Sequence, residues 1–217
     1  MDLYNIGIKI LVFAIPVIFA ITLHEAAHGY VAKHFGDTTA FMQGRVTLNP
    51  IKHIDPIGTI LLPIVTVLLS PYMFGWAKPV PVNFSNLRHP KRDMLWVAAA
   101  GPGSNILQML VWAVVAKLVI AFGSTSGLVG SFWLAVAEAG IAVNIMFAIL
   151  NLIPLLPLDG GRMVTSLLPN RLARAYSRLE PYGLIILLAL LFTGVLSWFL
   201  NPMYQAMKSQ TYALFGL

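Results

Sequence analysis

ILVFAIPVIFAITLHEAAH, residues 10–28, joins a long apolar stretch directly to two histidines and a glutamate. Residues four apart lie on one face of an α-helix, so His24 and His28 can present imidazole nitrogens to one metal ion, with Glu25 beside them as a base. Ionisable side chains cost roughly 2.5–3.5 kcal/mol each in a membrane helix and usually mark a function there. The stretch therefore predicts a divalent-metal site within a membrane helix, although the same five residues also occur as ordinary polar helix turns.

The composition indicates a multi-pass membrane protein. Of the 217 residues, 58% are hydrophobic and only 10% are charged, whereas about a quarter of the residues are charged in soluble domains. Because the sequence contains no cysteine, nitrogen and oxygen atoms must hold any zinc ion, which suits a catalytic site better than a structural one.

The net charge of +6 does not indicate nucleic-acid binding, because the basic residues fall in short loops between apolar runs. Two such loops, residues 88–92 and 162–178, carry half of the 14 lysine and arginine residues, and the turn at 123–130 carries no charge. The positive-inside rule places both basic loops on the cytoplasmic side of a bilayer.

The order of apolar runs predicts an all-α transmembrane bundle of about five to six spans that forms a single domain, residues 1–217. We expect helices at residues 6–35, 57–74, 94–122, 131–153 and 181–200. The second is interrupted by prolines and is interpreted as a kinked helix, with a re-entrant element as the alternative. Alternating prolines at residues 75–83 favour a small extended or β-hairpin-like segment whose free edge could pair with an unwound peptide.

A zinc hydrolase needs three protein ligands and one open position, and the histidine pair supplies only two ligands. Asp159 is the best candidate for the third, because two prolines before it and two glycines after it allow the chain to bend back towards the first helix. The alternative interpretation is that Asp159 caps the N-terminus of the following helix.

Four stretches carry a resemblance to a known family: HEAAH at 24–28, GWAKPVPVN at 75–83, AAGPGSN at 99–105 and NLIPLLPLDGG at 151–161. In these motifs and their order the sequence resembles the zinc-dependent site-2 proteases, which cleave transmembrane segments of other proteins. The resemblance covers nearly the whole chain and is closest to the short prokaryotic branch without PDZ or nucleotide-sensing domains. Ile153 stands where the family commonly has an aromatic residue, an exchange of one apolar side chain for another.

The resemblance implies that His24, His28 and Asp159 bind one zinc ion per chain and that Glu25 is the general base. It also implies that Asn151 faces the site, where its amide could donate to the oxyanion of the reaction. Alternatively, Asn151 bonds neighbouring helices together. The expected partners are the lipid bilayer and transmembrane helices of substrate proteins, which must partly unwind before cleavage.

The main alternative function is a zinc-binding membrane protein without proteolytic activity, either a transporter or a scaffold. Transport needs ligands along a path and a second polar site at depth, whereas the polar groups here converge on one place. A scaffold would not need Glu25. The sequence therefore favours hydrolysis in a prokaryotic cell membrane, with the active site towards the cytoplasm; it specifies neither the substrate nor an oligomeric state.

Overall fold

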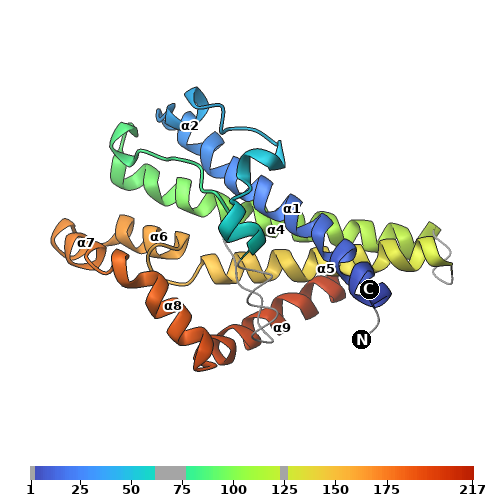
Figure 1. Ribbon diagram of the computed structural model, residues 1–217. Coiled ribbons are helices and arrows are strands. Elements are labelled where there is room, and N and C mark those ends of the chain that lie inside the picture. The colour runs from blue at the N-terminus through green and yellow to red at the C-terminus, as the bar shows by residue number, and fades with distance from the viewer. Residues whose placement is uncertain (1–2, 62–76, 123–126) are drawn as a thin grey trace.

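Three long helices form the centre of the fold in the computed structural model, which describes residues 3–61, 77–122 and 127–217 (Figure 1). They are α1 (Leu3–His34), α4 (Pro90–Phe122) and α5 (Leu128–Asn151). Helix α4 packs along α5, and α1 lies against both. The helices expected at residues 6–35, 94–122 and 131–153 are thus confirmed.

The C-terminal part consists of four further helices: α6 (Asp159–Leu167), α7 (Asn170–Ser177), α8 (Gly183–Phe192) and α9 (Val195–Phe215). Helix α6 packs against α4, while α8 leads away from the bundle and α9 returns to α5 (Figure 1). The continuous span expected at residues 181–200 is wrong, because Gly194 adopts a φ of +77°. This left-handed conformation cannot continue an α-helix, and glycine adopts it without a steric penalty.

The short elements are the helical turns α2 (Thr39–Met42), η1 (Pro50–His53), η2 (Pro56–Leu61), η3 (Phe84–Asn86) and η4 (Glu180–Tyr182). In the described ranges, four helical segments are long and apolar enough to cross a membrane, namely Gly7–His34, Pro90–Phe122, Leu128–Asn151 and Asn170–Phe192. The expected count of five to six spans is therefore not supported. Of the span expected at residues 57–74, only 57–61 is described, as part of the π-helical η2; the remainder lies outside the described residues.

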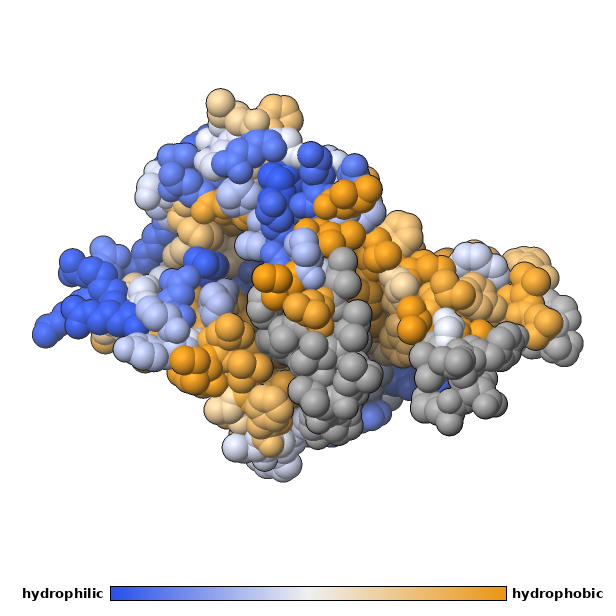
Figure 2. Space-filling view, viewed as in Figure 1, coloured by the Kyte–Doolittle hydropathy of each residue, from blue (hydrophilic) through white to orange (hydrophobic). Residues whose placement is uncertain are grey.

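The distribution of side chains fits a membrane bundle, because many large apolar side chains face outward and several polar side chains are buried between the helices. Ile10 and Leu107 are 61% and 64% exposed, whereas Asn105 and Asn144 are completely buried between the helices. Hydrophilic side chains gather around α2 and α7, and hydrophobic ones cover much of the other helices (Figure 2). The main apolar core joins α4, α5, α8 and α9 through Met109, Ala113, Ile141, Ile145, Ile149, Leu187, Leu196 and Leu200.

The β-hairpin-like segment expected at residues 75–83 is wrong for the part that is described, since residues 77–83 form no strand; residues 75–76 lie outside the described ranges. Three of its backbone N–H groups are instead bonded elsewhere: that of Lys78 donates to the His53 carbonyl at 3.0 Å, that of Val80 to Glu25 Oε2 at 2.7 Å and that of Asn83 to Asp37 Oδ2 at 2.7 Å. Prolines at 79 and 81 offer no N–H at all. The backbone is therefore held by side chains and loops rather than by a neighbouring strand.

Asp37 fastens this segment to the end of α1. Besides Asn83, its carboxylate accepts hydrogen bonds from the backbone N–H of Thr39 at 3.0 Å and from Asn86 Nδ2 at 3.3 Å. Burial alone would raise the pKa of Asp37, but the hydrogen bonds from Thr39, Asn83 and Asn86 outweigh it and hold the pKa below its usual value. An ionised Asp37 thus ties residues 77–86 to the helix that carries the histidine pair.

Candidate metal centre

Helix α1 presents His24 and His28 on one face, as the four-residue spacing predicts. Both side chains are buried, with 8% and 9% of their surface exposed. Their Nε2 atoms lie 3.1 Å apart and the rings meet edge to face at 82°. The two nitrogens therefore point at the same small volume beside the helix.

The opposite edge of each imidazole is held by an atom that can only accept a hydrogen bond. His24 Nδ1 lies 2.7 Å from Asn105 Oδ1, and His28 Nδ1 lies 2.7 Å from the Val97 carbonyl oxygen. Each Nδ1 must therefore carry the proton, and a neutral imidazole has only one N–H. Both Nε2 atoms consequently present lone pairs, which is the tautomer that a metal ion requires.

A chain of amides fixes the orientation of the Asn105 side chain. The Gly140 carbonyl can only accept, so Asn144 Nδ2 donates to it at 2.9 Å and Asn144 Oδ1 accepts from Asn105 Nδ2 at 2.9 Å. This leaves Asn105 Oδ1 for His24. Sequence reasoning did not identify either asparagine as a partner of the site, although a polar residue within an apolar span is itself a signal of function.

Asp159 is the first residue of α6 and completes the group. Its Oδ2 lies 3.3 Å from Nε2 of both His24 and His28. The N-cap position belongs to Leu158, and no side-chain capping bond is formed there, so Asp159 is not acting as a cap. Gly160 permits the placement, because a Cβ atom at this position would stand 2.3 Å from the Leu152 carbonyl oxygen.

Three atoms, Nε2 of His24, Nε2 of His28 and Oδ2 of Asp159, are spaced like three ligands of one tetrahedral metal ion. Ligand atoms about 2.0–2.1 Å from a tetrahedral zinc ion lie roughly 3.3–3.4 Å from one another, close to the observed 3.1, 3.3 and 3.3 Å. Asp159 Oδ2 is buried and receives no hydrogen bond within the described part of the chain. Two lone pairs and a carboxylate at this separation repel one another unless a cation lies between them, so the donor set fits a zinc ion.

The charge on Asp159 agrees with this role. Burial alone would raise the pKa of its carboxyl group, but positive charge placed at the facing His28 and His24 outweighs burial and holds the pKa well below its usual value, so a cation at this position keeps the carboxylate ionised. The carboxylate is therefore available as an anionic ligand.

Helix α4 closes one side of the group with Gly101. A Cβ atom at this position would stand 2.4 Å from His28 Nε2 and 2.6 Å from His24 Nε2. Such distances are far inside van der Waals contact, so only glycine lets the helix backbone approach both ring nitrogens.

The two remaining predicted residues, Glu25 and Asn151, differ in their surroundings. Glu25 is half-buried and its Oε2 accepts a hydrogen bond from the backbone N–H of Val80 at 2.7 Å. Asn151 ends α5, and its Nδ2 donates to the Phe147 carbonyl of its own helix at 3.0 Å. Among the bonds described, none joins Asn151 to the two histidines or Asp159, so its contribution to the site stays a prediction.

The hydrogen bond from His24 to Asn105 leads to a prediction about metal affinity. We expect Asn105→Ala to weaken zinc binding by about 10- to 100-fold, since loss of such an outer partner frees the imidazole to rotate and change tautomer. Zinc titration with a competing chelator measures the effect. The neighbouring Ser104→Ala, whose hydroxyl bonds the Gly101 carbonyl, serves as the control; equal affinities of the Asn105→Ala variant and the wild type would contradict the assignment.

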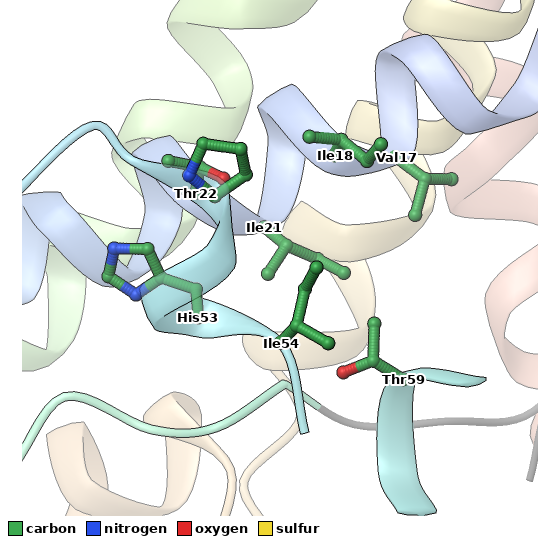
Figure 3. A pocket seen from close by; sticks show the side chains of 8 residues that line it. Val17, Ile18, Ile21, Thr22, His53, Ile54 and Thr59 are labelled. Carbon is green, nitrogen blue, oxygen red and sulfur yellow. The ribbon is translucent and has the colours of Figure 1, made fainter. Parts of the chain in front are cut away.

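A separate hollow lies on another part of α1, against residues 50–59 (Figure 3). Apolar side chains from both segments line most of it. The buried His53 also lines it, and its Nε2 lies 2.9 Å from the Thr47 carbonyl oxygen. It contains none of the three candidate ligands and is thus distinct from the metal group. Its lining residues are Val17, Ile18, Ile21, Thr22, Pro50, His53, Ile54 and Thr59.

The structure combines helices of membrane-spanning length with a buried group of two imidazoles and a carboxylate, those of His24, His28 and Asp159. These features define a membrane protein with the ligand set of a zinc hydrolase. The chain is 38% identical over 210 residues to the Bacillus subtilis protein named "Putative zinc metalloprotease YwhC", an alignment that covers 93% of this chain and 90% of that protein. This chain belongs to the same protein family. No family model and no solved structure matches it.

Two mycobacterial relatives carry a similar name. The chain is 29% identical over 201 residues to "Putative zinc metalloprotease Rip2" of Mycolicibacterium smegmatis, covering 92% of this chain and 73% of the relative. It is 27% identical over 200 residues to the protein of the same name in Mycobacterium tuberculosis, covering 91% and 73%. The similarity extends over nearly all of this chain in each case.

Proposed function

We propose that this protein is an intramembrane zinc metalloprotease of the site-2 protease type, which hydrolyses peptide bonds within or near transmembrane segments of other membrane proteins. The observation that carries the proposal is the group of three buried acceptor atoms, Nε2 of His24 and His28 and Oδ2 of Asp159, next to the carboxylate of Glu25. The names of the relatives support the metalloprotease part of it.

In this mechanism His24, His28 and Asp159 hold one zinc ion per chain. Zinc, when bound, lowers the pKa of a water molecule towards 7 and polarises the carbonyl of the bond to be cleaved. Glu25 takes the proton of the attacking water and later transfers it to the leaving amine. Asn105 and Val97 keep both imidazoles in the protonation state that leaves Nε2 free.

Asn151 is the proposed donor to the oxyanion. Its amide has two N–H groups, and one of them is bonded to the Phe147 carbonyl, which holds the side chain in place and leaves the second N–H for a substrate. A single donor of this kind is worth roughly 10² to 10³ in rate in other hydrolases.

We place the site towards the cytoplasmic side of a prokaryotic cell membrane. Lys91 Nζ donates to the Leu168 carbonyl and to Asn170 Oδ1, the latter at 3.1 Å. These bonds bring the two basic loops to the same end of the bundle, where the positive-inside rule expects them together. Substrate helices must unwind near this end, because a helix buries its carbonyls in internal hydrogen bonds.

The test is cleavage of a panel of tagged transmembrane proteins by the purified protein in liposomes. We expect one zinc per chain by elemental analysis, cleavage within or beside the membrane segment, loss of cleavage with a zinc chelator and its return on adding zinc. Zinc binding without cleavage of any substrate by the wild type would instead support the alternative of a non-proteolytic zinc protein. Cleavage that persists in zinc-free protein would exclude the metal mechanism.

A further inference from the structure

One peptide unit, between Pro79 and Val80, bridges Arg45 and Glu25. Its N–H is that of Val80 and donates to Glu25 Oε2 at 2.7 Å. Its carbonyl is that of Pro79 and accepts from Arg45 Nη2 at 3.2 Å. The same guanidinium nitrogen also donates to the Lys78 carbonyl at 3.0 Å. The bonds run unbroken from the cation to the carboxylate.

The bridging segment is held rigidly against α1. Prolines on both sides of Val80, at positions 79 and 81, fix their own φ angles. The Val80 side chain is buried and packs over Gly29, where a Cβ atom would stand 3.2 Å from Val80 Cγ1 and 2.8 Å from Val46 Cγ2. The position of the Val80 N–H relative to Glu25 is therefore set by packing as well as by hydrogen bonds.

Arg45 has its own local support. It follows Gly44, whose φ of +63° turns the chain after α2, and its backbone N–H donates to the Ala40 carbonyl at 2.9 Å. Hydrogen bonds from a charged donor are roughly twice as strong as neutral ones, and the planar guanidinium offers several N–H groups in a fixed geometry. A donor on the carbonyl of a peptide also polarises its N–H, which strengthens the bond to Glu25.

We propose that Arg45 is a positioning residue for hydrolysis and acts on Glu25 through the Pro79–Val80 peptide. The proposal rests on the protease function and on Glu25 as its base. A glutamate side chain has several rotatable bonds, and one fixed hydrogen bond to Oε2 restricts them. The bond thereby fixes the direction of the Glu25 carboxylate, which a general base must have to reach the proton that it removes.

The test compares Arg45→Gln, Arg45→Lys and wild type in the liposome cleavage assay, with zinc content and thermal unfolding measured on the same samples. We expect Arg45→Gln to lower kcat by about 10- to 100-fold, with KM and zinc content unchanged. Arg45→Lys should keep part of the wild-type kcat, since its ammonium group can donate to a carbonyl but lacks the planar set of N–H groups of a guanidinium. In a further variant, Arg45→Ala, added guanidinium ion should partly restore kcat.

Lys52→Gln is the matched control, because Lys52 is an exposed basic residue of the neighbouring η1, and we expect wild-type kinetics from it. An unchanged kcat in Arg45→Gln would overturn the proposal, as would a rise in KM alone, which would mean that the segment binds substrate instead. A higher kcat in Arg45→Gln would also overturn the proposal and would mean that the segment around Val80 blocks Glu25. Failure of the wild type to cut any substrate would count against the protease function itself, and the two results are thus distinguishable.

Discussion

Replacing Glu25 by glutamine is expected to lower the rate of peptide hydrolysis by about 10²- to 10⁴-fold while leaving one zinc ion bound per chain. The amide cannot accept the proton of the attacking water, and a positioned general base contributes typically 10² to 10⁴ in rate. Glu25 lies outside the group of three acceptor atoms formed by His24, His28 and Asp159, so the metal should stay. Cleavage of a tagged substrate and elemental analysis of the same preparation measure both quantities.

Glu138→Gln is the matched control for this experiment. Glu138 is an exposed glutamate of α5, so the same chemical change there should leave both cleavage and zinc content at wild-type values. If Glu25→Gln lost its zinc together with its activity, Glu25 would be supporting the metal site rather than serving as the base. If it kept full activity, the proposed mechanism would be wrong.

Gly101→Ala is expected to have the second large effect, loss of zinc together with loss of hydrolysis. The added Cβ would stand 2.4 Å from His28 Nε2 and 2.5 Å from His24 Cε1. Both imidazoles would therefore have to turn away from the shared metal position. The backbone of α4 cannot easily retreat, because a close-packed interior resists such shifts. We expect zinc content well below one per chain at metal concentrations that saturate the wild type.

Gly103→Ala tests whether this effect is specific. Gly103 lies on the same helix two residues further on, it is exposed, and a Cβ there meets nothing within 4 Å. Alanine favours a helix over glycine by about 1 kcal/mol, so this variant should be slightly more stable, with normal zinc binding and cleavage. Full zinc occupancy in Gly101→Ala would show that α4 does not approach the histidines as closely as described.

Local sequence patterns predicted all three candidate ligands, two on α1 and one at the start of α6. The four-residue spacing of His24 and His28 determined that both rings share a face of α1, and the structure places their Nε2 atoms 3.1 Å apart. Asp159 was predicted as the third ligand because the histidine pair supplies only two. The prolines and glycines around it also indicate that one helix ends and another begins there. The structure confirms that its carboxylate meets both imidazoles.

Other expectations failed because local patterns do not show which partner a backbone group will find. Alternating prolines predicted a free-edged strand at residues 75–83, but residues 78, 80 and 83 donate their N–H groups to His53, Glu25 and Asp37. A run of apolar residues predicted one span at 181–200, but Gly194 breaks it. Hydropathy measures the apolar character of a segment and carries no information on a left-handed residue within it.

The sequence by itself determined that this is a helical membrane protein and which residues could bind zinc, because composition and helical periodicity are properties of neighbouring residues. Only the tertiary structure decided what surrounds those residues. Asn105 orients His24 from 81 positions away along the chain, and the Val80 N–H meets Glu25 across 55 positions. Contacts over such separations arise when helices pack, since packing fixes which buried polar groups must satisfy one another.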